Sequence, residues 1–156
     1  MIFETREDFN APIDRVFPQI SDFDGFERSA LRRGAEIKRL DNLRQPGPGM
    51  KWDMKFLLRG KRREFQMEMV SFDPPNGMRF HTKTTGVNGV MHIDLIALSR
   101  TSTRLNIKLE LQATNLTGRL LLQSLKLARG SISNRVSGRM HEFARGIEDR
   151  INGSMA

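Results

Sequence analysis

The residue types that could carry acid–base chemistry are few, because the chain has three histidines and no cysteine. His92 and Asp94 lie two residues apart in an alternating stretch, so as part of a β-strand their side chains would point the same way. A carboxylate that orients an imidazole is a reasonable acid–base device. Met91, Ile93 and Leu95 occupy the apolar face of that stretch, which favours a solvent-facing position for the pair. We therefore predict no catalytic residue, keep His92 and Asp94 as the candidates should catalysis occur, and lean toward a protein that is not an enzyme.

Metal and phosphate chemistry find no support in the residue spacing. No His-x-x-x-His pair and no cluster of histidines with carboxylates is present, which argues against a metal site. The glycine-rich loop Gly47–Gly49 precedes an expected strand, whereas a loop that cradles phosphate precedes a helix. His81 is expected on an outer face beside Arg79 and Lys83, and His141 receives no role. We predict neither a metal nor a cofactor.

Size and charge restrict the class of protein. At 156 residues the chain suits a single domain, 1–156, with a sizeable core. The first residues include acids where a signal peptide requires a basic start, and no apolar run approaches the length of a membrane span. We therefore expect a soluble, cytoplasmic protein. The net charge of +8 favours phosphate or anionic lipid surfaces, although the basic residues are spread along the whole chain.

The elements that must position any site follow from hydrophobic periodicity. Apolar and polar residues alternate in a first strand, in a weaker second one and in five later ones separated by short Gly- or Pro-containing turns. Two short helices follow the first strand; Pro18 is expected to end or distort the first, and Phe26, Ala30 and Leu31 to form the apolar face of the second. Hairpin-length turns require largely antiparallel pairing. The expected strands are 2–10, 35–41, 50–59, 64–69, 78–85, 90–98 and 104–112.

The C-terminal stretch Leu116–Ile151 predicts one long helix that covers the sheet. We expect Ala128–Ile151 to clamp the sheet. Gly130 is the weak point, because glycine costs a helix interior roughly 1 kcal/mol relative to alanine. It either permits close approach to the sheet, which we prefer, or breaks the helix in two.

Three motifs, together with the order of the expected strands and helices, resemble the START-like (SRPBCC, helix-grip) superfamily, in particular its bacterial polyketide cyclase/dehydrase and lipid-transport branch. Ala11–Phe17 is similar to the family's short helix after the first strand, Gly47–Trp52 to its glycine loop and aromatic strand, and Leu120–Ile151 to its final helix. The resemblance implies an α+β helix-grip fold: a curved six- to seven-stranded antiparallel sheet wrapped around a long C-terminal helix, with two short helices after strand 1. It also implies a deep cavity between the inner face of the sheet and the C-terminal helix, for an apolar ligand such as a lipid, quinone or polyketide-like molecule. Leu116–Leu125 would roof this cavity and its entrance.

The strand periodicity places a set of mostly apolar side chains on one face, where they line such a cavity or fill a solid core; the sequence leaves both readings open. Two hydroxyl-bearing residues on that face, Thr82 and Thr84, fit a cavity with a few orienting groups. The predicted lining consists of Trp52, Met54, Phe56, Phe65, Met67, Met69, Met78, Phe80, Thr82, Met91, Ile93, Leu105, Ile107, Leu121, Leu125 and Ala128.

Three functions remain open. We favour the binding, transport or chaperoning of a small hydrophobic ligand by a monomer or homodimer. The alternatives are a cyclase- or dehydratase-like enzyme that acts on such a ligand, and an interaction module with an Arg-rich surface. The clusters Arg32–Arg33 and Lys61–Arg63 could touch an anionic membrane. A nucleic-acid partner is disfavoured, because Trp52 and Lys51 would lie on opposite faces of their strand and form no stacking platform.

Overall fold

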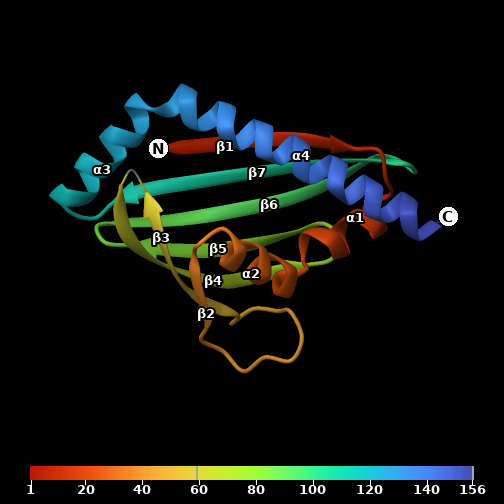
Figure 1. Cartoon of the computed structure of the whole chain (residues 1–156), viewed down its shortest axis with the longest axis horizontal. Coiled ribbons are helices and arrows are strands. Elements are labelled where there is room, and N and C mark those ends of the chain that lie inside the picture. Colours follow the sequence, from red (N-terminus) through yellow and green to blue (C-terminus); the bar gives the residue numbers. More distant parts are fainter. Residues whose placement is uncertain (59, 156) are drawn as a thin grey trace.

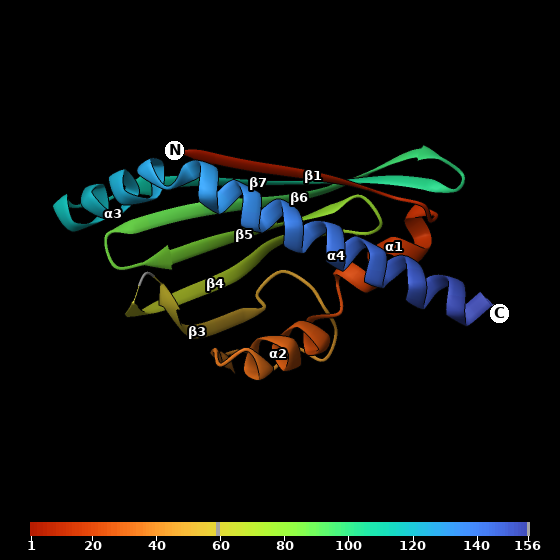
Figure 2. The ribbon, with the colours of Figure 1, turned by 45° about the horizontal axis from the view of Figure 1, so that its top comes forward.

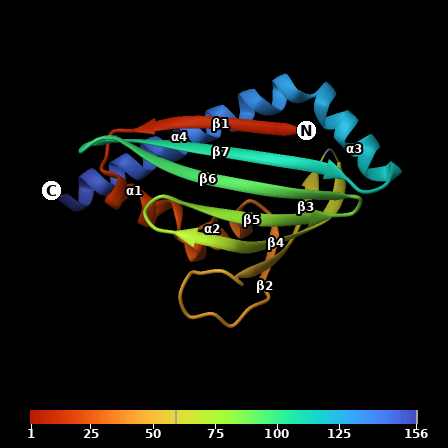
Figure 3. The ribbon, with the colours of Figure 1, turned by 180° about the vertical axis from the view of Figure 1, so that it is seen from behind.

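The computed structural model describes residues 1–58 and 60–155. One antiparallel sheet of seven strands runs through it in the order β1-β7-β6-β5-β4-β3-β2, with the helices gathered on its inner face (Figure 1 and Figure 2). Seen from behind, strands β1, β7, β6, β5 and β4 run side by side across the outer face (Figure 3). The strands are β1 (Ile2–Phe9), β2 (Glu36–Arg39), β3 (Lys51–Leu58), β4 (Lys61–Asp73), β5 (Gly77–Thr84), β6 (Val87–Ser99) and β7 (Ser102–Ala113). The helices are α1 (Ile13–Ile20), α2 (Phe23–Arg32), α3 (Leu116–Leu127) and α4 (Arg129–Met155).

The predicted sheet is confirmed, and the strand boundaries differ in an informative way. β4 and β6 are each longer than their alternating stretches, and each contains a register shift, between Met69 and Ser71 and between Ala97 and Ser99. A bulge inserts an extra residue and interrupts the apolar–polar alternation. The pattern therefore stops at the bulge in β4, although the pairing continues beyond it.

Helix α1 does not end at Pro18. It continues to Ile20, because Val16, Phe17 and Ile20 are buried and hold the last turn against the core. The carbonyl of Phe17 accepts hydrogen bonds from the backbone and the hydroxyl of Ser21, which satisfies the end of the helix. Tertiary packing thus outweighs the backbone hydrogen bond that proline removes.

The prediction of a single C-terminal helix is wrong in one respect, because the structure has two helices that meet at Ala128. This residue has φ −95° and ψ 10°, and the ribbon bends there (Figure 1). Gly130 is the second residue of α4, and a Cβ placed on it would meet no atom within 4 Å. Our preferred explanation, that Gly130 permits close approach to the sheet, is therefore also wrong.

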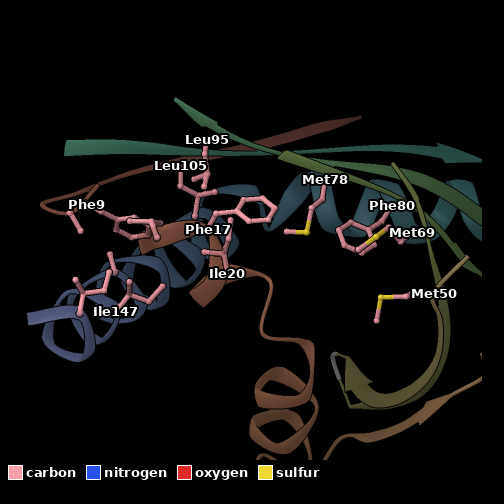
Figure 4. Close-up of a cluster of buried hydrophobic side chains, with 14 of the residues drawn as sticks. Phe9, Phe17, Ile20, Met50, Met69, Met78, Phe80, Leu95, Leu105 and Ile147 are labelled. Atoms are coloured by element: carbon pink, nitrogen blue, oxygen red, sulfur yellow. The ribbon is translucent and has the colours of Figure 1, made fainter. Parts of the chain in front are cut away.

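A sealed core occupies one end of the sheet. Phe9, Phe17 and Leu105 pack there with Ile147 from the last turns of α4 (Figure 4). The clamp predicted for Ala128–Ile151 is correspondingly shorter than expected, since Val136 is 40% exposed and the buried face of α4 begins near Met140. The other members of this core are Ala11, Val16, Ile20, Met50, Trp52, Met69, Met78, Phe80, Leu95, Ala144 and Ile151.

Candidate functional site

The inner face of the sheet is an array of apolar side chains in register across the strands. Met69, Phe80 and Met91 lie opposite one another on β4, β5 and β6, and the next row contains Met67 opposite Thr82. Directly opposed residues share a face of the sheet and contact each other. The strand residues that we predicted to line a cavity therefore do project from one common face.

This face is sealed in part and open in part. Six of the predicted lining residues are buried: Trp52, Met69, Met78, Phe80, Thr82 and Leu105. The other ten are only half-buried: Met54, Phe56, Phe65, Met67, Met91, Ile93, Ile107, Leu121, Leu125 and Ala128. The solid-core alternative thus describes the end under α1 and the C-terminal half of α4. The half toward α3 keeps apolar surface accessible to solvent.

The total accessible surface supports this description. It amounts to 10,097 Å². A compact monomer of 17.9 kDa would expose about 8,000 Å². The excess reflects an inner face that the helices leave partly uncovered, together with the exposed surfaces of α3 and α4 (Figure 2).

Aromatic rings from three elements form one wall of this face. Phe23 of α2 lies 5.4 Å from the Trp52 ring and 6.3 Å from the Phe80 ring, measured between centroids. The ring of Phe26, about one turn further along α2, lies 5.6 Å from the ring of Phe143 in α4, measured between centroids. The second helix is thus present, but its predicted apolar face is wrong in detail, since Phe26 and Leu31 are 41% and 55% exposed. The Phe26–Phe143 pair joins α2 to α4 across the inner face.

A charged network fixes the same helix to the sheet. The indole Nε1 of Trp52 donates a 2.9 Å hydrogen bond to Glu27 of α2, and the Arg39 guanidinium lies 5.6 Å from the centroid of the indole ring. Arg39 also makes two hydrogen bonds to Asp41, at 2.7 and 2.8 Å. These bonds, with a further one from the backbone N–H of Lys51, hold the pKa of Asp41 far below its usual range.

Glu7 is a half-buried carboxylate on the inner face whose role our sequence reasoning missed. It shares the face of Phe3, Thr5 and Phe9 on β1, and its side chain is 18% exposed. The alternation of inward and outward residues along β1, which buries Phe9, puts Glu7 on the same face. A carboxylate at this position is available either to orient a bound molecule or to hold the helix that packs above it.

Contacts from α4 surround this carboxylate. His141 Nδ1 lies 3.4 Å from Glu7 Oε1, and Arg145 lies 3.6 Å from the same oxygen. Arg145 also pairs with Glu148 at 3.0 Å, and Glu148 accepts a hydrogen bond from the backbone N–H of Asn10. The cluster ties α4 to the end of β1.

His92 and Asp94 face away from this site, as the periodicity indicated. They alternate with Met91, Ile93 and Leu95, and Asp94 is exposed. His92 Nε2 lies 3.7 Å from Glu110. The pKa of Glu110 is lowered mainly by its hydrogen bond to Lys108, with smaller contributions from His92. The pair does not form a catalytic dyad on the inner face.

Two surface depressions lie elsewhere. One, of about 600 Å³, is on the outer face and is lined by His81, Lys83, Asn88, Val90, Glu110 and Gln112 with the edges of neighbouring strands. The other, of about 400 Å³, lies between α2 and the β2–β3 loop beside Arg39 and Arg44. Of the predicted lining residues, Thr82 alone borders the larger depression and none borders the smaller one, so the predicted lining forms an open face rather than one of these hollows.

The basic clusters also have defined positions. Arg32 and Arg33 end α2, whereas Lys61–Arg63 follow the β3–β4 turn, where Arg62 pairs with Glu36 at 2.6 Å. Across residues 1–58 and 60–155, no group of three or more His, Asp and Glu side chains is placed to hold a metal ion. No helix in that part of the chain combines the length and apolar character that crossing a bilayer requires.

Comparisons with known proteins identify the fold. No family model and no curated protein matches the sequence. Among solved structures, the Zhui aromatase/cyclase from Streptomyces sp. R1128 is 13% identical, with 97% of this chain and 95% of that chain covered and a TM-score of 0.69. Norcoclaurine synthase from Thalictrum flavum is 14% identical, with 97% and 86% covered and a TM-score of 0.67. TTHA0849 from Thermus thermophilus is 15% identical over the whole of both chains, with a TM-score of 0.65. The predicted resemblance is thereby confirmed at the level of architecture, and the chain has the helix-grip fold.

Proposed function

We propose that the protein binds a small hydrophobic molecule, such as a lipid, a quinone or a polyketide-like compound, against the open half of its inner sheet face. The observation that carries this proposal is the run of half-buried apolar side chains, among them Met67, Met91 and Ile107, on a face that a water-soluble fold normally covers. Methionine suits such a surface, because its flexible and polarizable side chain adapts to ligands of different shape.

Polar groups at the margins supply the orientation that an apolar surface lacks. Glu7 and the Glu27–Arg39 pair flank the inner face, so a ligand with one hydroxyl or carbonyl group would find a partner at either margin. The fold comparisons add support, because they include a protein named as an aromatase/cyclase and one named as norcoclaurine synthase. Both names describe enzymes that act on small organic molecules. For this chain we propose only the binding of such a molecule.

A cyclase- or dehydratase-like activity is the second candidate, and one observation favours it. The half-buried Glu7 and the solvent-exposed His141 form a carboxylate–imidazole contact at 3.4 Å, which is the kind of pair that moves protons. Under this candidate, Glu7→Gln would abolish turnover of a bound substrate while leaving its binding intact. Under the binding proposal alone, the same variant alters only affinity.

Native mass spectrometry of the full chain purified from its native cells tests the binding proposal directly. We expect a complex heavier than the polypeptide by the mass of one apolar compound, which organic extraction then releases for identification. A bare polypeptide, combined with no saturable uptake of the neutral apolar dye Nile red, would contradict the proposal.

A further inference from the structure

Helix α3 is apolar on two opposite faces. Gly118, Leu121 and Leu125 face the sheet and are buried or half-buried. On the other side, Leu116, Leu120 and Leu127 form an outward stripe at helical spacing and are 70%, 59% and 91% exposed. A surface helix of a globular protein normally turns a polar face to water. The outward stripe therefore needs a partner that the sheet does not provide.

The charge around the stripe is of one sign. The 31 residues from Leu111 to His141 contain no Asp or Glu, and they contain five basic residues: Arg119, Lys126, Arg129, Arg135 and Arg139. Among the described residues, Arg119, Lys126, Arg135 and Arg139 have no carboxylate within ion-pair distance. By helical spacing, Arg119 and Lys126 flank one side of the leucine stripe. Leucines edged by unpaired cations are typical of a helix that lies in a membrane interface.

The end of β3 and the start of β4 add to the same end of the molecule. Leu57 of β3 is 75% exposed, and Lys61, the first residue of β4, is exposed as well. Figures 1 and 2 both place the end of β3 and helix α3 at one end of the molecule, with the β6–β7 turn at the other. We define the α3 end as Leu116, Leu120, Leu127, Arg119 and Lys126 together with Leu57 and Lys61.

We propose that the α3 end docks onto the surface of an anionic lipid bilayer, with the outward leucines inserted at the headgroup level and the flanking cations on lipid phosphates. Charge complementarity favours an anionic bilayer over a second copy of the chain as the partner of this surface. A second copy of the chain would present the same cations and the same net charge of +8, so self-association through this stripe is opposed by like-charge repulsion. This docking surface is distinct from the inner face and stands whether or not that face binds a ligand.

The test is co-sedimentation of the full chain with vesicles of phosphatidylcholine, with and without phosphatidylglycerol. We expect binding that depends on phosphatidylglycerol and falls as salt rises. Leu120→Glu, and separately the pair Arg119→Glu and Lys126→Glu, should each weaken it by at least about tenfold. The matched controls lie at the opposite end: Ile96→Glu, at a residue of similar exposure (53%), and Arg100→Glu should leave binding unchanged.

Three results would overturn the proposal. The first is equal sedimentation with neutral and anionic vesicles, and the second is equal loss in the α3-end variants and their controls. The third is a dimer in sedimentation velocity that Leu120→Glu dissociates, without vesicle binding by the parent chain, because the stripe would then be a protein interface. Circular dichroism of each variant confirms that the fold persists. Met67→Lys, which targets the inner face, should not change vesicle binding, so this test and that of the proposed function fail independently.

Discussion

The backbone of Gly118, in the first turn of α3, packs directly against the carbonyl of Gly86 in the β5–β6 turn. Asn115 caps the helix by accepting a 2.8 Å hydrogen bond from the N–H of Gly118, and Thr114 donates its N–H to Gly86. Gly86 itself has a φ of +77°, which favours glycine. Two glycines thus let a helix and a turn touch through their main chains, and this contact sets where α3 lies over the sheet.

Gly118→Ala should therefore destabilise the protein. A Cβ at this position would overlap the Gly86 carbonyl, and overpacking of this kind costs about 1–3 kcal/mol. Urea unfolding followed by circular dichroism measures the change. Gly130→Ala is the matched control, because it adds the same methyl group to a helix with no atom within 4 Å and should stabilise by about 0.5–1 kcal/mol. Equal effects of the two substitutions would contradict the close contact.

Glu148→Ala should loosen α4 from β1. Glu148 is 8% exposed, accepts a hydrogen bond from the backbone N–H of Asn10 and pairs with Arg145. Its removal leaves the Asn10 N–H without this acceptor, whereas Arg145 keeps its hydrogen bond to the carbonyl of Asp8. We expect a loss of about 1–3 kcal/mol in the free energy of unfolding. Hydrogen exchange should also accelerate at Asn10 more than elsewhere in the sheet. Asp149→Ala, at the exposed neighbouring position, should change neither quantity.

The Arg39–Asp41 pair predicts a specific acid response. The folded pKa of Asp41 lies far below its unfolded value, mainly because of the hydrogen bonds from Arg39, so its ionised form stabilises the fold. That contribution is complete above the unfolded pKa of about 3.9 and is lost as the pH falls further. Asp41→Asn should cost about 1.5–3 kcal/mol at neutral pH, with a difference from the parent chain that shrinks below pH 4 or so. Asp94→Asn, at an exposed carboxylate, is the control. A difference that stays constant with pH would show that Asp41 acts through packing alone.

Met67→Lys probes the proposed ligand face. The side chain is half-buried on the inner face, so a charge there should weaken Nile red binding by about tenfold or more while the fold survives. Gln66→Lys adds the same charge one residue away on the exposed outer face and should leave affinity unchanged. Phe80 is unsuitable for this purpose, because it is only 3% exposed and belongs to the sealed core. Undiminished binding by a folded Met67→Lys variant would remove the inner face from consideration.

Much of this architecture could be predicted from the sequence, because the sheet is encoded locally. Residues such as Met67 and Met69 alternate with polar neighbours, and a period of two assigns each to a face without knowledge of its partners. The outward orientation of His92 follows from the same rule and agrees with its contact with Glu110. The asparagine cap at Asn115 likewise lies where the sequence placed the start of the long helix.

Features that depend on distant contacts could not be predicted in this way. Gly118 and Gly130 are both helical glycines in the same stretch, and only the position of Gly86 in space distinguishes the one under close contact. Glu7 was overlooked because an acidic residue on an inner face becomes acceptable only through His141 and Arg145, which lie more than 130 residues along the chain. How far α4 covers the sheet depends on the bend at Ala128. Gly130 marked this stretch as weak and left a break as one alternative, but the packing that results from the bend does not follow from a single glycine.

The strand order also dictates when the sheet can be completed. Ile2 pairs with Glu110 and Phe9 with Thr103, so β1 has no partner until β7, which ends at Ala113, has left the ribosome. Strands β3 to β7 are joined by short turns and can pair as they emerge, whereas β1 must wait for a long loop to close. Phe9, which is fully buried in the final structure, is therefore exposed throughout most of synthesis. β1 can join the sheet only after β7 has formed, and α4 can then pack against β1. Docking of the first strand is therefore a late folding event.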